Sequence, residues 1–152
     1  MALDIIASLC KNEKTLKITH ALASAIFTIH YFLLGAIPGA LSELFNSART
    51  GLSAYIQSKL LGVFFLSLYI FMLFIVPDTP TEALPFIASL SITIGLYFYT
   101  GIAMRACHLC GWIIWLIYSI QIVSIGSTIL FTILTITTTI SILKLQQSKN
   151  KD

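Results

Sequence analysis

Two polar side chains, Asn46 and Arg49, stand three residues apart in an otherwise apolar stretch. Side chains three or four residues apart share one face of a helix, and Ser42 and Ser53 extend this face. An ionisable group in a membrane segment is a functional candidate, because burying a charge in lipid is costly. We interpret the stripe as one wall of a pathway for an anionic or hydroxylated solute. The alternative is a structural role, with Arg49 bonded to backbone carbonyls or to a carboxylate such as Glu43.

Further polar groups stand on other apolar segments. His30 and Tyr118 lie toward the outer half of their segments, and Gln121 follows Tyr118 by about one helical turn. These groups have the chemistry to bind a solute or relay a proton; the alternative is hydrogen bonding between helices. Thr132 and Thr135 belong to a stripe of threonines that could form the opposite wall. The alternative for that stripe is helix packing, with hydroxyls bonded to carbonyls one turn earlier.

The sequence Cys107-His108-x-Cys110 contains side chains that bind metals. On a helix, however, His108 points about 100° away from the neighbouring cysteine, and a structural zinc site takes four ligands. The sequence also contains no constellation of nucleophile and base and no Gly-rich phosphate loop. We therefore expect no metal, no cofactor and no enzymatic activity.

The composition excludes most soluble classes of protein. Of 152 residues, 57% are hydrophobic and 10% are charged, and the mean hydropathy is +0.93. A soluble domain is about 45–50% apolar and about 25% charged. A chain this short cannot bury the excess apolar surface, which must therefore face lipid. A soluble enzyme, a nucleic-acid-binding protein and a disordered chain are all disfavoured.

Five segments are apolar and long enough to cross a bilayer core, which takes roughly 20 residues. They are 18–36, 60–76, 84–103, 106–123 and 127–143. If 39–57 also crosses, all lysines and arginines of the connections lie on one side, which the positive-inside rule makes cytoplasmic. The acidic connection 78–82 is then outside and the C-terminus is inside. Residues 1–10 make about half a span, and we expect a truncated or misassigned start to this first helix.

The sequence indicates an internal repeat when it is aligned with itself at an offset of 88 positions. The shift aligns Lys17 with Arg105, His20 with His108, and His30 with Tyr118. Spans one to three would then repeat as spans five to seven, with 60–76 as a connector that is apolar all round and needs little protein contact. Two parallel repeats about an axis along the membrane normal form a known transporter plan.

Several short motifs resemble the YgjV family of bacterial inner-membrane proteins. They are the run 29–35, Gly39-Ala40, Asn46-x-x-Arg49, Leu84-Pro85, 101–105 and 115–118. The resemblance covers nearly the whole chain and implies a fold and a bacterial inner-membrane location rather than an activity. The three-one-three plan also resembles the SWEET and PQ-loop transporters in architecture alone, since no Pro-Gln dipeptide occurs.

We therefore predict an all-α, polytopic membrane helix bundle with one membrane domain. Its parts are the first repeat 1–57, the linker helix and loop 58–83, the second repeat 84–143 and the cytoplasmic tail 144–152. The predicted function is alternating-access transport of a small polar or anionic solute. The alternative is a membrane scaffold or accessory subunit that does not transport. The expected partners are the lipid bilayer, that solute and a second copy of the chain in a homo-oligomer, but no nucleic acid.

Overall fold

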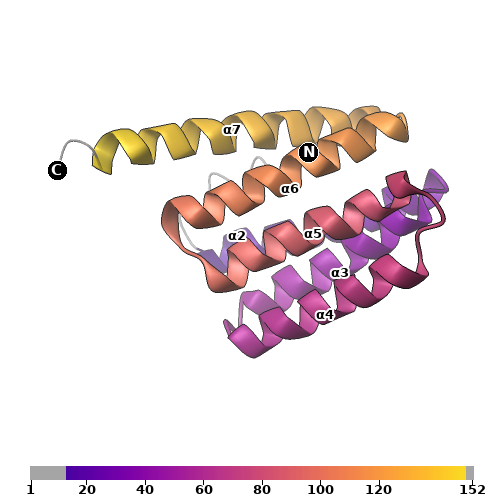
Figure 1. Cartoon of the computed structure of the whole chain (residues 1–152), viewed down its shortest axis with the longest axis horizontal. Coiled ribbons are helices and arrows are strands. Elements are labelled where there is room, and N and C mark those ends of the chain that lie inside the picture. The colour runs from indigo at the N-terminus through magenta and orange to yellow at the C-terminus, as the bar shows by residue number, and fades with distance from the viewer. Residues whose placement is uncertain (1–12, 150–152) are drawn as a thin grey trace.

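The computed structural model describes residues 13–149, and this part of the chain is helical throughout apart from short connections. The expectation for the first helix, residues 1–10, falls outside the described residues. Consecutive helices run in opposite directions (Figure 1). They are α2 (Glu13–Leu33), α3 (Ile37–Ser53), α4 (Lys59–Ile75), α5 (Pro80–Phe98), α6 (Gly101–Gln121) and α7 (Ile125–Lys149). The predicted all-α bundle is confirmed.

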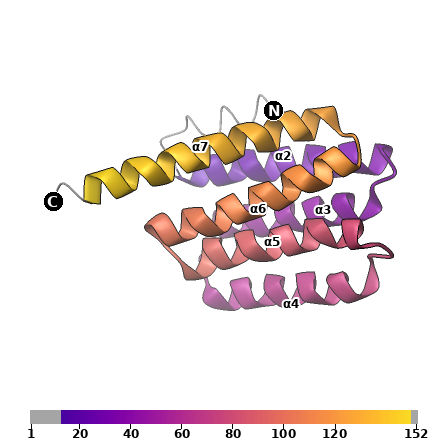
Figure 2. The ribbon, with the colours of Figure 1, turned by 45° about the horizontal axis from the view of Figure 1, so that its top comes forward.

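The helices associate mostly with their neighbours in the sequence. Close pairs are α2 with α3, α4 with α5, α5 with α6, and α6 with α7. The contact of α3 with α5 brings the first half of the described chain against the second (Figure 2). Among the described helices α7 packs closely against α6, and its C-terminal end extends past the rest of the bundle (Figure 1).

Side-chain caps and the local backbone conformation set several of the helix boundaries. Ser58 and Thr79 are N-caps whose side chains accept hydrogen bonds from Leu60 N and Glu82 N, which satisfies backbone donors that a helix start leaves open. The predicted boundary between 84–103 and 106–123 differs from the structure. Tyr99 and Thr100 are extended and Gly101 has φ 62°, so α5 already ends at Phe98.

Two of the helix connections have the same backbone geometry. In the α2–α3 connection, Gly35 N donates to Phe32 O and Ala36 N donates to Tyr31 O. In the α6–α7 connection, Val123 N donates to Ile120 O and Ser124 N donates to Ser119 O. This pair of bonds is a Schellman motif, whose penultimate residue is left-handed. Gly35 and Val123 accordingly have φ values of 73° and 55°.

The connector α4 differs from its prediction as a helix that needs little protein contact. It buries Gly62, Phe65 and Tyr69, and the last two pack with Phe86 of α5 in a core cluster. Tyr69 is fully buried, and its hydroxyl bonds to α3. Gly62, Phe65 and Tyr69 therefore give this helix one face toward protein.

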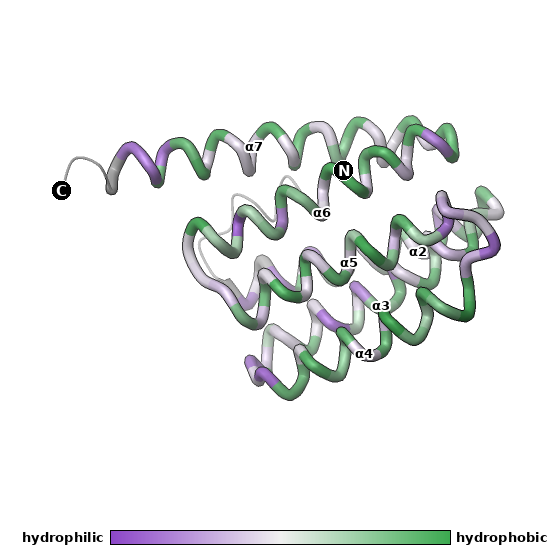
Figure 3. The backbone as a smooth tube through the Cα atoms, viewed as in Figure 1, coloured by the Kyte–Doolittle hydropathy of each residue, from purple (hydrophilic) through white to green (hydrophobic). Residues whose placement is uncertain are grey.

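The outer surface of the bundle is strongly apolar. Many large hydrophobic side chains are exposed, among them Leu60 at 81% and Phe74 at 84%. Hydrophobic residues cover much of the length of the helices, and hydrophilic stretches appear at the ends of helices and within α3 and α6 (Figure 3). By length and composition, three described helices can cross a membrane: Pro80–Phe98, Gly101–Gln121 and Ile125–Gln147. The protein is thus built to be surrounded by lipid.

Candidate functional site

The polar stripe predicted on α3 lies inside the bundle. Ser42, Asn46, Arg49 and Ser53 are all at most 5% exposed. Their spacing of four, three and four residues puts them on one face, and that face packs against α4 and α5. Sequence reasoning therefore identified the polar face of α3 and its burial, though not the groups that meet it.

Arg49 bonds to α5 through one nitrogen of its guanidinium. Nη1 donates to Ser89 O at 3.2 Å and to Thr93 Oγ1 at 2.5 Å. Thr93 Oγ1 in turn donates to Ser89 O at 2.6 Å. Arg49 Nε is buried and has no hydrogen-bond partner. A buried donor without an acceptor costs free energy, so this nitrogen is a polar group that the fold leaves unsatisfied.

Three more hydrogen bonds link α3, α4 and α5 in this buried polar cluster. Tyr69 Oη donates to Asn46 Oδ1 at 2.7 Å. Ser42 Oγ is 2.8 Å from Ser89 Oγ and 3.0 Å from Pro85 O. The sequence carried a signal for these partners: Pro85, Ser89 and Thr93 stand at intervals of four in an apolar helix. That signal was missed.

His30 and Tyr118 lie in a second cluster, at the end of the bundle that holds the α2–α3 and α6–α7 connections. His30 Nε2 is 2.9 Å from Ser124 Oγ, and Ser127 Oγ donates to the same Ser124 oxygen. Tyr118 fits against Gly39, where a Cβ atom would lie 2.7 Å from the phenol oxygen. These contacts join α2 and α3 to α6 and α7.

Tyr31 is the centre of this junction. Its ring stacks on Trp115, with centroids 5.8 Å apart, and Trp115 stacks on Phe131 at 5.3 Å. Tyr31 Oη is 3.4 Å from Ser119 Oγ. Tyr31, Trp115 and Ser119 are fully buried. The junction is therefore both densely packed and hydrogen-bonded.

The remaining predicted site residues do not join either cluster. Gln121 and Thr132 are exposed, and Thr135 is half-buried with no partner for its hydroxyl. Thr132 Oγ1 donates to Thr128 O one turn earlier, as the packing alternative expected. Arg49 stands about 18 Å along α3 from Ile37, which follows the α2–α3 connection. The structure thus separates the predicted residues into two buried groups and an exposed remainder.

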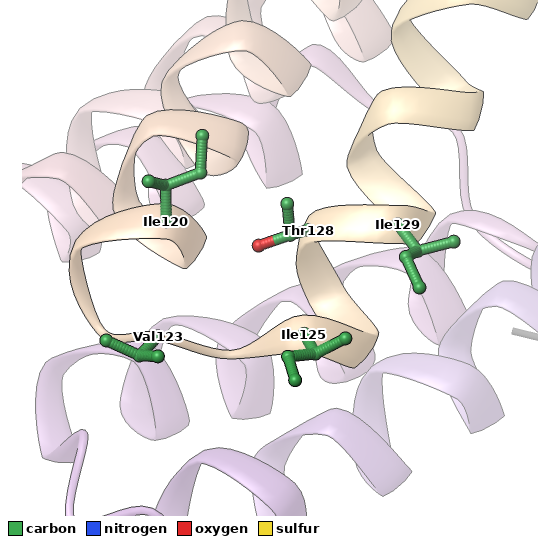
Figure 4. Close-up of a pocket in the computed structure, with 5 residues that line it drawn as sticks. All are labelled: Ile120, Val123, Ile125, Thr128 and Ile129. Carbon is green, nitrogen blue, oxygen red and sulfur yellow. The ribbon is translucent and has the colours of Figure 1, made fainter.

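A groove of about 250 Å³ lies at the α6–α7 connection (Figure 4). Its lining is apolar apart from one hydroxyl, and consists of Ile120, Val123, Ile125, Thr128 and Ile129. The Thr128 hydroxyl already donates to Ser124 O at 2.8 Å. A groove without an unused polar group gives a polar solute nothing to bind, and its apolar lining suits a lipid chain.

The cysteine motif of α6 shows no metal-binding geometry. His108 Nδ1 is 2.8 Å from Met104 O, its own backbone one turn earlier. Within residues 13–149, no group of three His, Cys, Asp or Glu side chains lies close enough to hold a metal ion. Gly95, whose Cβ would lie 2.8 Å from that of Cys107, brings α5 against α6 here. In this structure the motif serves helix packing.

The sequence matches one protein family over nearly its whole length. A family described as "Bacterial inner membrane protein", Imp-YgjV, matches residues 1–149. The inner membrane protein YgjV of Escherichia coli (strain K12) is 28% identical over 120 residues, which are 79% of this chain and 66% of that protein. The chain thus aligns with slightly less than two thirds of this relative's length. No solved structure matches. Since the match covers nearly every residue of an apolar helix bundle, the chain belongs to the YgjV family of bacterial inner-membrane proteins.

Proposed function

We propose that this protein is a carrier for a small polar or anionic solute and works by rocking two related helical units against each other. The units are 1–57 and 84–143, and α4 connects them. The observation that carries the proposal is the match between the α2–α3 and α6–α7 connections, which extends to their hydrogen bonds. The proposed activity is movement of a solute without chemical change.

The 88-residue offset recurs in the contacts of both units. Leu34 N donates to His30 O as Ile122 N does to Tyr118 O, and further such pairs follow through each connection. At the opposite end, Lys17 Nζ donates to Ser53 O, and Arg105 Nη1 donates to Ser141 Oγ, at the corresponding positions. Equivalent contacts at both ends support an internal repeat rather than a chance likeness of turns.

The contact of Tyr31 with Ser119 supports a two-fold relation between the units. These residues are also separated by 88 positions, so they are equivalent to each other. In an assembly with two-fold symmetry, equivalent residues contact each other at the axis. Two parallel units that meet on an axis along the membrane normal form the plan of several transporters, with the solute bound at the interface of the repeats near the midplane.

The polar cluster around Arg49 supplies chemistry for a solute. The Nε–H of Arg49 has no acceptor among the described residues. A carboxylate, phosphate or hydroxyl oxygen would satisfy this donor, and Asn46 lies one turn away on the same helix face. His30 and Tyr118 would then belong to the outer side of the pathway. We infer an outward α2–α3 connection and a cytoplasmic C-terminus from the positions of the lysines and arginines.

Uptake of solutes into proteoliposomes tests this proposal. Wild-type protein should accumulate a subset of a broad panel of sugars, amino acids and organic or inorganic anions. Asn46→Ala and Arg49→Ala should reduce that uptake, because they remove the proposed donors. Thr132→Ala is the matched control, since Thr132 is exposed and bonds only to its own helix. Uptake that is the same for all variants would remove Asn46 and Arg49 from the proposal.

A second function is favoured by one specific observation. Arg49 Nη1 is bonded to Ser89 O and Thr93 Oγ1, which is how a purely structural arginine would join α3 to α5. A scaffold or accessory subunit needs no more than this. Proteoliposomes that accumulate no solute of the panel, together with a protein partner that remains bound after purification in detergent, would favour the scaffold.

A further inference from the structure

The cations of α6 and α7 have no acidic residue near them in the sequence. No Asp or Glu occurs between Glu82 and Asp152, and both Arg105 and Lys144 lie in this stretch. Glu82 is at the start of α5, whereas Arg105 and Lys144 are at the opposite end of the bundle, because consecutive helices run in opposite directions (Figure 1). Helices α5, α6 and α7 therefore do not neutralise these two positive charges.

A hydrogen bond between α6 and α7 brings the two cations to the same place. Arg105 Nη1 donates to Ser141 Oγ, and Lys144 follows Ser141 by three residues. Side chains three residues apart share one face of a helix, so Lys144 lies on the side of α7 that meets Arg105. Arg105 is half-buried and Lys144 is exposed. Together they form a basic pair where the start of α6 meets the last turns of α7.

The described residues leave much of the basic pair unsatisfied. Arg105 Nε is buried and has no hydrogen-bond partner, which costs free energy. Lys144 makes no hydrogen bond or ion pair with the part of the chain that the structure describes. The pair thus has both charge and hydrogen-bond donors available for an anion.

The corresponding cation of the first unit is used differently. Lys17, at the repeat position of Arg105, donates to Ser53 O, and Ser53 is the last residue of α3. A lysine that bonds to an open carbonyl at a helix end stabilises that helix. By contrast, α7 continues from Ser141 to Lys149, about 12 Å further. The carbonyl of Ser141 lies within the helix, and the extension adds Lys144 beside Arg105.

Next to the basic pair, toward the middle of α7, an apolar face is exposed. Ile136, Ile140 and Leu143 are 54%, 46% and 52% exposed, and their spacing of four and three residues puts them on one face. The end of α7 beyond them is hydrophilic (Figure 3). Long basic side chains at the ends of membrane helices reach the level of the lipid headgroups. The order of apolar face and cations along α7 therefore matches the order of tails and headgroup in a phospholipid.

We propose that Arg105 and Lys144 bind the phosphate of an anionic phospholipid whose tails lie along Ile136, Ile140 and Leu143. A guanidinium donates two parallel hydrogen bonds to a phosphate, and an ammonium group adds a second positive charge. Basic groups between membrane helices are a general means of binding anionic headgroups. The lipid neutralises charges that α5, α6 and α7 leave uncompensated. This inference is independent of the proposed carrier function.

Native mass spectrometry of the full chain tests the site, with titration of phosphatidylglycerol and of phosphatidylcholine into the detergent-solubilised protein. Wild-type protein should bind phosphatidylglycerol more tightly, because phosphatidylcholine carries a cationic group of its own. Arg105→Gln and Lys144→Gln should each weaken phosphatidylglycerol binding at least about 5-fold, as expected for the loss of one basic residue. Lys59→Gln is the matched control, since Lys59 is an exposed lysine at the same end of the bundle but on α4. Equal binding of both lipids, or equal weakening in all three variants, would overturn the site.

Further samples keep the test decisive. Arg105→Lys keeps the charge without the paired donors and should bind phosphatidylglycerol with an affinity between those of wild type and Arg105→Gln. If Arg105→Gln does not fold, Lys144→Gln alone decides, because Lys144 is exposed. Inorganic phosphate in excess should leave the lipid bound, since phosphate has no tails to contact α7. Displacement of the lipid by phosphate would indicate a site for the free anion and would contradict the proposal.

The position of the lipid has its own test. Trp112 follows Arg105 by seven residues, so it lies about 10 Å away along the same face of α6. In nanodiscs, phosphatidylglycerol with brominated tails should quench tryptophan fluorescence more strongly than brominated phosphatidylcholine. Lys144→Gln should remove this difference and Lys59→Gln should retain it. A difference that persists in Lys144→Gln places the lipid elsewhere and rejects the basic pair as its site.

Discussion

Gly35 and Val123 adopt the same left-handed conformation, with φ values of 73° and 55°, at matching points of two helix connections. Glycine adopts this conformation without strain, whereas a β-branched residue does so at a cost. The α2–α3 connection thus has a residue that suits its backbone conformation, and the α6–α7 connection has a residue that does not. Free energy of unfolding should therefore respond in opposite directions to substitution at these two positions.

Val123→Gly should stabilise the protein by about 1 kcal/mol, because the strain of a side chain at positive φ is removed. Gly35→Ala should destabilise it by a similar amount. A Cβ at Gly35 would meet nothing within 4 Å, so the backbone conformation alone would be responsible. Thermal unfolding in detergent measures both changes. A lower melting temperature for Val123→Gly would contradict the strain that we assign to this turn.

Gly39→Ala should destabilise the protein by about 1–3 kcal/mol, since the new methyl group would overlap Tyr118. Gly126→Ala is the matched control, because nothing lies within 4 Å of its Cβ position. The penalty should shrink in a Tyr118→Phe background, which lacks the oxygen nearest to the new Cβ. An equal loss of melting temperature for both glycine variants would argue against close packing at Tyr118.

Tyr69→Phe should lower the free energy of unfolding by about 1–2 kcal/mol, since Asn46 Oδ1 would stay buried without its donor. Asn46→Ala should cost a comparable amount, and the double variant should cost less than the sum. Tyr99→Phe, at an exposed phenol, should change little. A strictly additive double variant would mean that the two side chains do not interact.

Arg49→Met should fold and should be equally stable or more stable, by about 1–2 kcal/mol, because replacing a buried charge by an apolar side chain often stabilises. Ser89 O and Thr93 Oγ1 would still be bonded to each other. Measuring both thermal unfolding and solute uptake of Arg49→Met separates a functional role of Arg49 from a structural one. Loss of uptake with retained stability supports a functional arginine, and a large loss of stability supports a structural one.

Reporter fusions test the orientation of the chain. Alkaline phosphatase joined after Asp78 should be active, because the α4–α5 connection is expected to be outside. A green fluorescent protein joined at the C-terminus should fluoresce, as it does in the cytoplasm. Fusions that report the same side for both sites would overturn the membrane topology and, with it, the parallel repeat.

The sequence was sufficient to predict the helices and the buried face of α3, because hydrophobic length and residue spacing determine both. It was not sufficient to identify the partners of that face. Tyr69 belongs to a helix that is otherwise apolar, and nothing local distinguishes a phenol that faces lipid from one that faces Asn46. Ser89 and Thr93 were overlooked for the same reason, since small hydroxylated residues are common in membrane helices. Pairing between helices depends on tertiary packing, which periodicity along one helix does not encode.

The aromatic stack at the junction has a practical consequence. Both tryptophans of the chain, Trp112 and Trp115, stack on Phe131, and Trp115 also stacks on Tyr31 of α2. Tryptophan fluorescence therefore originates from one aromatic stack that involves α2, α6 and α7. A separation of α2 from α6 would take the Tyr31 ring away from Trp115 and change the emission of Trp115, so an unlabelled sample can report any such movement.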